Sequence, residues 1–232
     1  MSVKRVVGLA IMVGALVGCT EARIAVPAQL AASAEPVQLT GMGFGQRGKF
    51  VLGASSGTFT RHSLSARAPQ PFMAEDFTSF FGDGSFSVAG ADFAGRVEAD
   101  CRFLESEADT GPATVTTIPF RYKCTFSRDG KPMDAGLILH AAPRRVGPLL
   151  AETRIGRLVL EGRTVGIEPI HHSPQLGIPT SEPLGYRFVR DGRDIGAIDL
   201  NGERKTIYAP RNGADREVVL MAGLALSVLW RS

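Results

Sequence analysis

Alternating apolar and polar side chains mark two strands in the middle of the chain. Residues 96–103 alternate charged and apolar positions, and residues 120–127 repeat the pattern with aromatic side chains on the apolar positions. Successive side chains of a β-strand point to opposite faces, so a period of two indicates a strand with one buried face. Each segment carries a cysteine, Cys101 or Cys124, on its apolar face. The pattern predicts two half-buried strands.

The two cysteines fit one antiparallel register. With Cys101 opposite Cys124, every other opposed pair on that face is apolar. These pairs are Phe103 with Tyr122 and Ala99 with Phe126. Directly opposed Cα atoms lie about 4.5–5.5 Å apart, within the reach of a disulfide. A metal site is the alternative, but no CxxC or His stands nearby to complete one. We predict a structural disulfide between Cys101 and Cys124.

An Asp-Gly pair extends these strands into a meander. Asp129-Gly130 lies between two alternating runs, and it suits a two-residue turn in which both central residues adopt positive φ. Three strands are predicted, over residues 96–105, 118–128 and 131–140. The turn sets the expected pairs between the last two strands, which are Phe126 with Met133, Cys124 with Ala135, Tyr122 with Leu137, and Phe120 with Leu139.

Two further hairpins are predicted in the second half of the chain. Over residues 158–167 we expect the turn at Gly162-Arg163, and over residues 186–200 we expect it at Asp191-Gly192. In the later hairpin, a bulge at Gly196 would return the following apolar residues to the buried face. The expected opposed pairs are Leu160 with Val165, Leu158 with Ile167, Phe188 with Ile195, and Tyr186 with Ala197.

The apolar segment Val218–Trp230 predicts a buried helix. Its Ala, Leu and Met residues favour helix, Asp215 is placed to cap the N-terminus, and Glu217 lies in the first turn. At 13 residues the segment is too short to span a bilayer, and it is apolar all round. We therefore expect a mainly β fold, an antiparallel meander or barrel of hairpins around this helix or packed against it. The segment also alternates between Val218 and Val228, so a central strand stays open.

The order of these elements resembles the tubby-like barrels. Strand hairpins are followed by an Asp-Gly turn and Gly-x-Ile within Asp191–Ile198, an acidic cap, and an apolar C-terminal helix. The superfamily includes plant LURP-one-related proteins and phospholipid scramblases. The resemblance covers residues 40–232 and implies a barrel around the helix, in a protein that handles a lipid or another small ligand.

The N-terminus has the features of a secretory signal. Lys4 and Arg5 precede the apolar stretch Val6–Val17, which is too short for a membrane-spanning helix. The stretch leads into Leu16-Val17-Gly18-Cys19, which resembles the lipobox of bacterial lipoprotein precursors. The resemblance implies cleavage before Cys19, diacylglycerol on its thiol and, in most Gram-negative lineages, an acylated amine. An ordinary cleaved signal and an uncleaved anchor are the alternatives.

The lipobox divides the chain into three parts. We expect residues 1–18 to be a signal peptide, residues 19–37 to be a lipidated tether rich in Ala, and residues 38–232 to be one β-rich domain. Two or three acyl chains hold a protein firmly on a membrane. Thr20, rather than Asp, follows Cys19, which in enteric bacteria implies the outer membrane, with the domain facing the periplasm.

Composition and charge narrow the functional classes. Of the 232 residues, 44% are hydrophobic and 21% are charged, which is typical of globular proteins and excludes general disorder. The net charge is +3, and removal of Lys4 and Arg5 with the signal leaves 24 basic against 23 acidic residues. So balanced a chain is not expected to bind nucleic acid.

Two segments contain part of a cofactor-binding or metal-binding motif but lack the rest of it. Residues 43–48 match GxGxxG, but a β-like run follows and no βαβ pattern surrounds them, so we expect a turn and no cofactor. His171-His172 lies beside Glu168 in a Pro-rich segment and could suggest zinc. No metal-site spacing is present, and we expect an exposed polar loop instead.

No residue is predicted to be catalytic, because no nucleophile elbow or comparable context is present.

A cluster of phenylalanines is expected to form core or a packed Ω-loop, and would be a contact for a partner or a lipid if exposed. The cluster contains Phe72, Phe77, Phe80, Phe81 and Phe86.

Three functions follow from the sequence. The first is a non-enzymatic envelope lipoprotein, bound to the membrane through Cys19, that acts as a binding or structural module for an envelope protein or a lipid. The second is a tubby-like barrel that handles a lipid or small ligand, and the third is an envelope hydrolase without a recognisable motif. A filled core would favour the first, a deep apolar cavity the second, and convergent Ser, His and acidic side chains the third.

Overall fold

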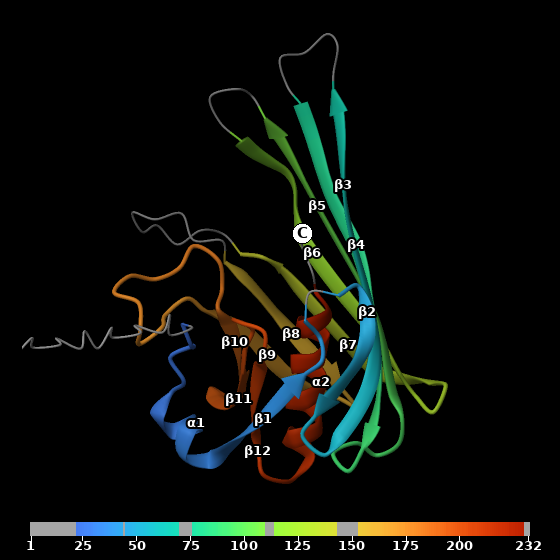
Figure 1. The fold of residues 1–232 in the computed structure, drawn as a ribbon, viewed down its shortest axis with the longest axis vertical. Helices are drawn as coiled ribbons and strands as arrows, with labels where there is room; N and C mark the ends of the chain where they lie inside the picture. The colour runs from blue at the N-terminus through green and yellow to red at the C-terminus, as the bar shows by residue number, and fades with distance from the viewer. Residues whose placement is uncertain (1–21, 44, 70–75, 110–113, 143–152, 230–232) are drawn as a thin grey trace, which may run out of the picture.

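The computed structural model describes residues 22–43, 45–69, 76–109, 114–142 and 153–229 (Figure 1). The predicted signal peptide and Cys19 lie outside these ranges. In chain order the elements are α1 (Ala28–Ser33), β1 (Ala34–Thr40), β2 (Arg47–Leu52), β3 (Ser55–Pro69), β4 (Asp76–Gly90), β5 (Val97–Asp109), β6 (Thr114–Arg128), β7 (Lys131–Ala141), β8 (Arg154–Leu160), β9 (Arg163–Ile170), β10 (Gly185–Arg190), β11 (Arg193–Asp199), β12 (Lys205–Pro210) and α2 (Ala214–Val228).

The strands form one closed antiparallel barrel. Each strand pairs with the next one along the chain, and β1 closes the barrel by pairing with β12 as well as β2. Closure gives the first and last strands a partner on both sides, so neither is left as an open edge along its paired length. The mainly β prediction is confirmed in its barrel form.

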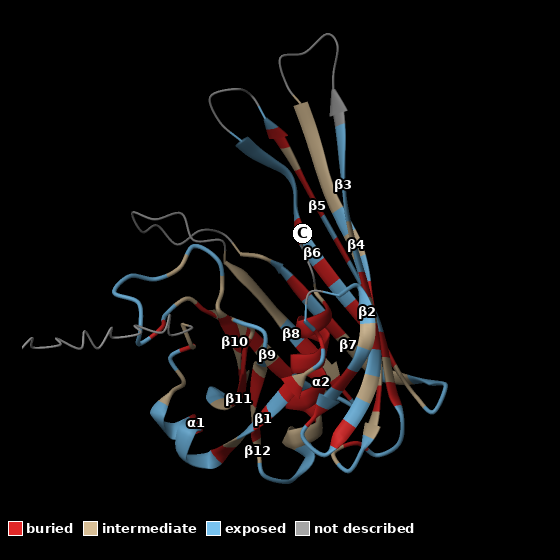
Figure 2. Ribbon diagram, viewed as in Figure 1, coloured by how far each residue is buried: buried red, intermediate tan, exposed pale blue. Residues whose placement is uncertain are grey.

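The helix α2 occupies the barrel interior (Figure 1). Every residue from Val218 to Val228 is buried (Figure 2). The Tyr122 hydroxyl on β6 donates a hydrogen bond of 2.6 Å to the Ala225 carbonyl, and burial raises the pKa of that hydroxyl. The alternative of a central strand is wrong, because a helix satisfies its own backbone inside a barrel whose strands are already paired.

The helix begins earlier than predicted and without the predicted cap. Gly213 occupies the N-cap position, and no side chain caps the first turn. Asp215 instead forms an ion pair with Arg190 on β10, and Glu217 lies 2.7 Å from the Arg128 guanidinium on β6. Both carboxylates lie in the first turn, where the helix dipole favours negative charge.

The predicted register between the first two strands is confirmed. Cys101 on β5 lies opposite Cys124 on β6, and the flanking apolar pairs are those that the alternation predicts. The two sulfur atoms are 2.08 Å apart, the distance of a disulfide bond. Both cysteines are buried on the inner face of the barrel.

The predicted register of the β6–β7 hairpin is only partly correct. Asp129 and Gly130 form the turn, both with positive φ. A bulge between Thr125 and Ser127 then shifts the pairing by two residues, so the expected pairs beyond it are wrong. The observed pairs there are Cys124 with Leu137 and Tyr122 with Leu139. A shift of two keeps the same side chains on the buried face, which is why the alternation alone did not reveal it.

The two later hairpins also depart from the predicted pairs. The β8–β9 turn lies at Glu161-Gly162, both with positive φ, rather than at Gly162-Arg163, so Leu158 faces Val165. The β10–β11 turn lies at Asp191-Gly192 as predicted. The expected bulge is present beside Gly196, and the pairs beyond it are offset by one from those expected. They are Phe188 with Gly196 and Tyr186 with Ile198.

The domain begins before residue 38, so the tether prediction is wrong from Ile24 onward. The strand β1 starts at Ala34 and pairs along its length with β12. Before it, α1 is a short helix that the sequence did not predict. Apolar side chains of this segment pack on the outer face of the barrel against β9 and β11. This outer cluster contains Ile24, Leu30, Ala34, Ile170 and Ala197.

The two ends of the barrel differ. At one end, tight turns at 129–130, 161–162 and 191–192 join the strands. At the other end, which we call the mouth, lie the segments 41–46, 171–184 and 200–204 and the C-terminal end of α2. Strands β3–β6 extend beyond the mouth as an arm (Figure 1).

The described members of the phenylalanine cluster lie on the strand β4 and not in an Ω-loop. Phe77, Phe80, Phe81 and Phe86 all belong to β4, whereas Phe72 lies outside the described residues. Phe86 is buried in the core, and Phe81 is 38% exposed on the outer face. Phe81 pairs across the arm with Leu64 and Leu104, so part of the cluster is core and part is an exposed apolar row.

Candidate functional site

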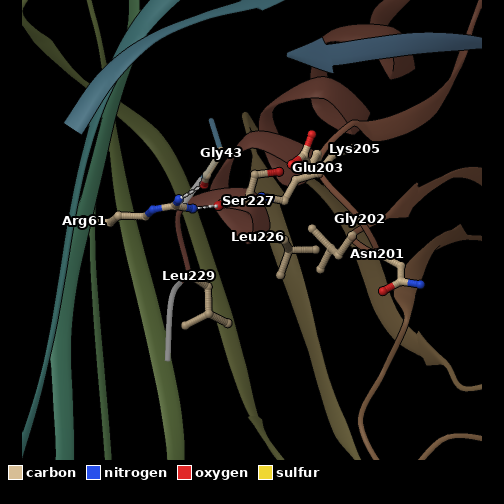
Figure 3. A pocket seen from close by; sticks show the side chains of 10 residues that line it. Gly43, Arg61, Asn201, Gly202, Glu203, Lys205, Leu226, Ser227 and Leu229 are labelled. Atoms are coloured by element: carbon tan, nitrogen blue, oxygen red, sulfur yellow. Dashed lines mark hydrogen bonds between the residues drawn. The ribbon is translucent and has the colours of Figure 1, made fainter. Parts of the chain in front are cut away.

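A pocket of about 520 Å³ opens at the mouth of the barrel, beyond the last turn of α2 (Figure 3). Three parts of the fold surround it: the segment after β1, the segment between β11 and β12, and the end of the helix. The lining residues are Gly43, Arg61, Leu200, Asn201, Gly202, Glu203, Lys205, Leu226, Ser227 and Leu229. The pocket combines an apolar floor with two cationic side chains.

Arg61 on β3 holds the wall of this pocket together. Its side chain is buried, and it donates to the carbonyls of Met42 at 2.7 Å, Gly43, and Gly45 at 2.9 Å. It also donates to the Ser227 carbonyl at 3.5 Å, at the end of α2, where helix carbonyls lack intrahelical partners. Burial lowers the pKa of its guanidinium. Arg61 therefore joins the segment after β1 to the end of the helix.

This arrangement explains the glycine-rich segment 43–48. A dinucleotide-binding loop presents backbone N–H groups to phosphate at the start of a helix. Here the backbone presents carbonyl oxygens to an arginine, and β2 follows directly. The segment begins in the β1–β2 connection and ends in the first two residues of β2.

Lys205 on β12 is the second cation of the pocket. Burial and, to a lesser degree, the positive charge of Arg61 together lower the pKa of its amine to about 8. In the ranges the structure describes, no acceptor forms a hydrogen bond with this amine. The amine is therefore one polar group of the pocket with capacity for a ligand.

Replacing Lys205 by Met is expected to raise the free energy of unfolding at pH 7. Below about pH 8 the folded and unfolded chains both carry the charge, so its burial penalty is fully present. Between about pH 8 and the ordinary lysine pKa of 10.5, the folded state loses its proton first, and the penalty is released. Urea unfolding at pH 7 and pH 10.5 measures the difference, which should shrink at the higher pH. An equal difference at both pH values would contradict the buried charge.

The residues that suggested a metal do not converge on one. The His171 Nδ1 lies 3.0 Å from the Thr180 carbonyl, and the Thr180 N–H donates to the His171 carbonyl at 2.9 Å. Glu168 pairs with Arg187 on the neighbouring strand. Within the described ranges, no group of three or more His, Cys, Asp or Glu side chains is placed to hold a metal ion. His171 serves to fix the segment 171–184.

The pair formed by His62 and Asp83 lies on the surface. His62 on β3 and Asp83 on β4 approach to 3.3 Å on the outer face of the barrel, with more than half of each side chain exposed. Water competes for such a pair, so its contribution to stability is small.

Neither cation of the pocket was predicted from the sequence. Arg61 occupies an inward position two residues after Phe59, and it lies opposite Gly84 on β4. A charged residue on the buried side of an alternating strand was the signal that could have identified it. Lys205 carried no such signal, because its burial depends on contacts far away in the sequence.

No protein-family model, curated protein or solved structure matches this chain. Among the residues that the structure describes, no helix has both the length and the apolar character needed to cross a membrane.

Proposed function

We propose that this protein is a lipid-anchored protein of the cell envelope whose barrel is a non-enzymatic binding or structural module. The observation that supports this most strongly is the filled interior. Apolar residues of α2 take up the space in which a barrel of this kind could hold a ligand. Partners would therefore meet the outer surface, the arm or the mouth.

The anchor is proposed from the sequence at the N-terminus. Residues Leu16–Cys19 match the four lipobox positions, after a basic start and a short apolar stretch. Lipidation of Cys19 would attach the barrel to a membrane of the envelope, and Thr20 after it favours the outer membrane. The folded domain follows within a few residues, because Ile24 is already buried against the barrel.

A second candidate is a barrel that handles a small ligand, as the resemblance to tubby-like barrels implies. The observation in its favour is the pocket at the mouth. Lys205 and Arg61 outweigh the negative charge of Glu203, and Leu226 and Leu229 supply apolar surface. A ligand with an anionic group and a short apolar part would fit this chemistry. The hydrolase hypothesis gains no comparable support, since Glu168 pairs with Arg187 and the His171 Nδ1 faces the Thr180 carbonyl.

The anchor is tested by the variant Cys19→Ser in cells grown with labelled palmitate. We expect the parent chain to take up label, and the variant to take up none and to keep residues 1–18, because the acylated thiol precedes cleavage. Thr20→Ser is the matched control, since it changes the neighbouring hydroxyl residue and leaves the lipobox intact. Uptake of label by Cys19→Ser would refute the proposed anchor.

A further inference from the structure

The first described residues lie at the mouth of the barrel. The Asn201 side-chain amide donates to the Ala22 carbonyl at 2.6 Å. The Arg23 N–H donates to the Gln175 side chain at 3.1 Å, and the Ala25 N–H donates to the His172 carbonyl at 2.9 Å. Three hydrogen bonds thus fix the entry of the chain against the segments 171–184 and 200–204.

The length of chain beyond this point fixes where an anchor must lie. Cys19 stands three residues before Ala22. Even a fully extended chain spans about 3.6 Å per residue, so the Cys19 backbone lies within about 11 Å of Ala22. Acyl chains on Cys19 therefore bring the membrane to the mouth, beside residues 171–184.

The segment 171–184 exposes apolar side chains at this place. Ile178 is 67% exposed and Leu176 is 40% exposed, and Ile178 is the most exposed large hydrophobic residue in the ranges described. The segment is held in place by a turn, in which the Leu176 N–H donates to the Ser173 carbonyl at 3.1 Å, and by the pairing of His171 with Thr180. A fixed segment that presents apolar side chains to water favours a contact surface.

The opposite end of the barrel has a different character. Three of its hairpin turns begin with an exposed acidic residue followed by glycine: Asp129-Gly130, Glu161-Gly162 and Asp191-Gly192. Such turns suit water and carry no large apolar side chain. The arm stands on the other side of the mouth from residues 171–184 (Figure 1). The apolar segment 171–184 thus lies at this end of the barrel, beside the entry of the chain.

We propose that the segment 171–184 is a membrane contact surface, in which Leu176 and Ile178 enter the interfacial region of the bilayer that holds the Cys19 acyl chains. This inference rests on the proposed lipidation. Removal of exposed apolar surface from water is favourable, and the anchor raises the effective concentration of bilayer at these side chains. The contact sets the orientation of the barrel, with the mouth towards the lipid and the acidic turns away from it.

The test places an environment-sensitive fluorophore on single cysteines introduced into the full, acylated protein. Ile178→Cys reports on the contact surface, and Arg193→Cys, exposed beside the turn at the opposite end, is the matched control. The proteins are reconstituted into vesicles of phosphatidylethanolamine and phosphatidylglycerol and separated by flotation. The reference for each probe is its emission on the unacylated chain in detergent-free solution. On vesicles we expect the emission of the probe at residue 178 to shift to shorter wavelength. The emission of the probe at residue 193 should stay at its reference wavelength.

The outcomes separate this inference from the anchor on which it rests. Protein that does not float with the vesicles refutes the anchor, and with it the contact surface. Protein that floats while the probe at residue 178 keeps its solution emission refutes the contact surface alone. An equal shift at both positions also overturns it, because the barrel would then have no preferred orientation.

Discussion

Replacement of Leu224 by Glu is expected to prevent the chain from folding. Leu224 is fully buried at the centre of α2, with strands on all sides of the helix. An ionised carboxylate left there without a partner costs more than the roughly 5–15 kcal/mol by which a domain is stable. Soluble yield and far-ultraviolet circular dichroism of the purified chain measure the effect. We expect insoluble protein from this variant, with the parent chain expressed without its signal peptide as the reference.

The matched control for this variant is Ala214→Glu. Ala214 is the first residue of the same helix and is exposed, and an acidic side chain in the first turn is favourable. This variant should fold with unchanged yield. A soluble, folded Leu224→Glu chain would mean that α2 is not the core of the barrel.

Loss of the bond between Cys101 and Cys124 is expected to lower the free energy of unfolding by about 3 kcal/mol, on the chain-entropy model for a loop of this length. The two cysteines are separated by 23 residues and lie on neighbouring strands. Urea unfolding of the double variant Cys101→Ala with Cys124→Ala, compared with the oxidised parent, measures the loss.

The same experiment under reducing conditions provides the control. Reductant should lower the unfolding midpoint of the parent chain and leave that of the double variant unchanged, because the variant has no bond to break. A parent chain that is equally stable with and without reductant would show that the two thiols are not bonded.

The strands were predictable because their patterns are local. Alternation places Cys101 and Cys124 on inward faces, and Asp-Gly pairs supply the positive φ that two-residue turns need. The errors arose where the backbone departs from a simple ladder. A bulge between Thr125 and Ser127 moves the register of the β6–β7 pair by two residues. Glu161 adopts a positive φ, which is uncommon for glutamate and which its residue type therefore does not predict. Neither feature changes which side chains are apolar, so the hydrophobic pattern cannot report it.

The N-terminal part of the domain and the pocket were not predictable for a different reason. Residues 24–33 show no periodicity, and they become ordered only against the outer face of β9 and β11. Lys205 lies among residues brought together by barrel closure, which pairs β12 with a strand about 170 positions earlier. Arg61 and Ser227 likewise meet only because the helix ends beside β3. Contacts of this kind depend on the closed topology and not on any local sequence.

The central claim is that a barrel filled by its own helix is held on a membrane by a lipid on Cys19. The most direct measurement is the mass of the N-terminal peptide of the protein extracted from cell membranes. We predict a peptide that begins at Cys19 and carries diacylglycerol on the thiol. A peptide that begins at any other residue, or one with a free Cys19 thiol, would contradict it.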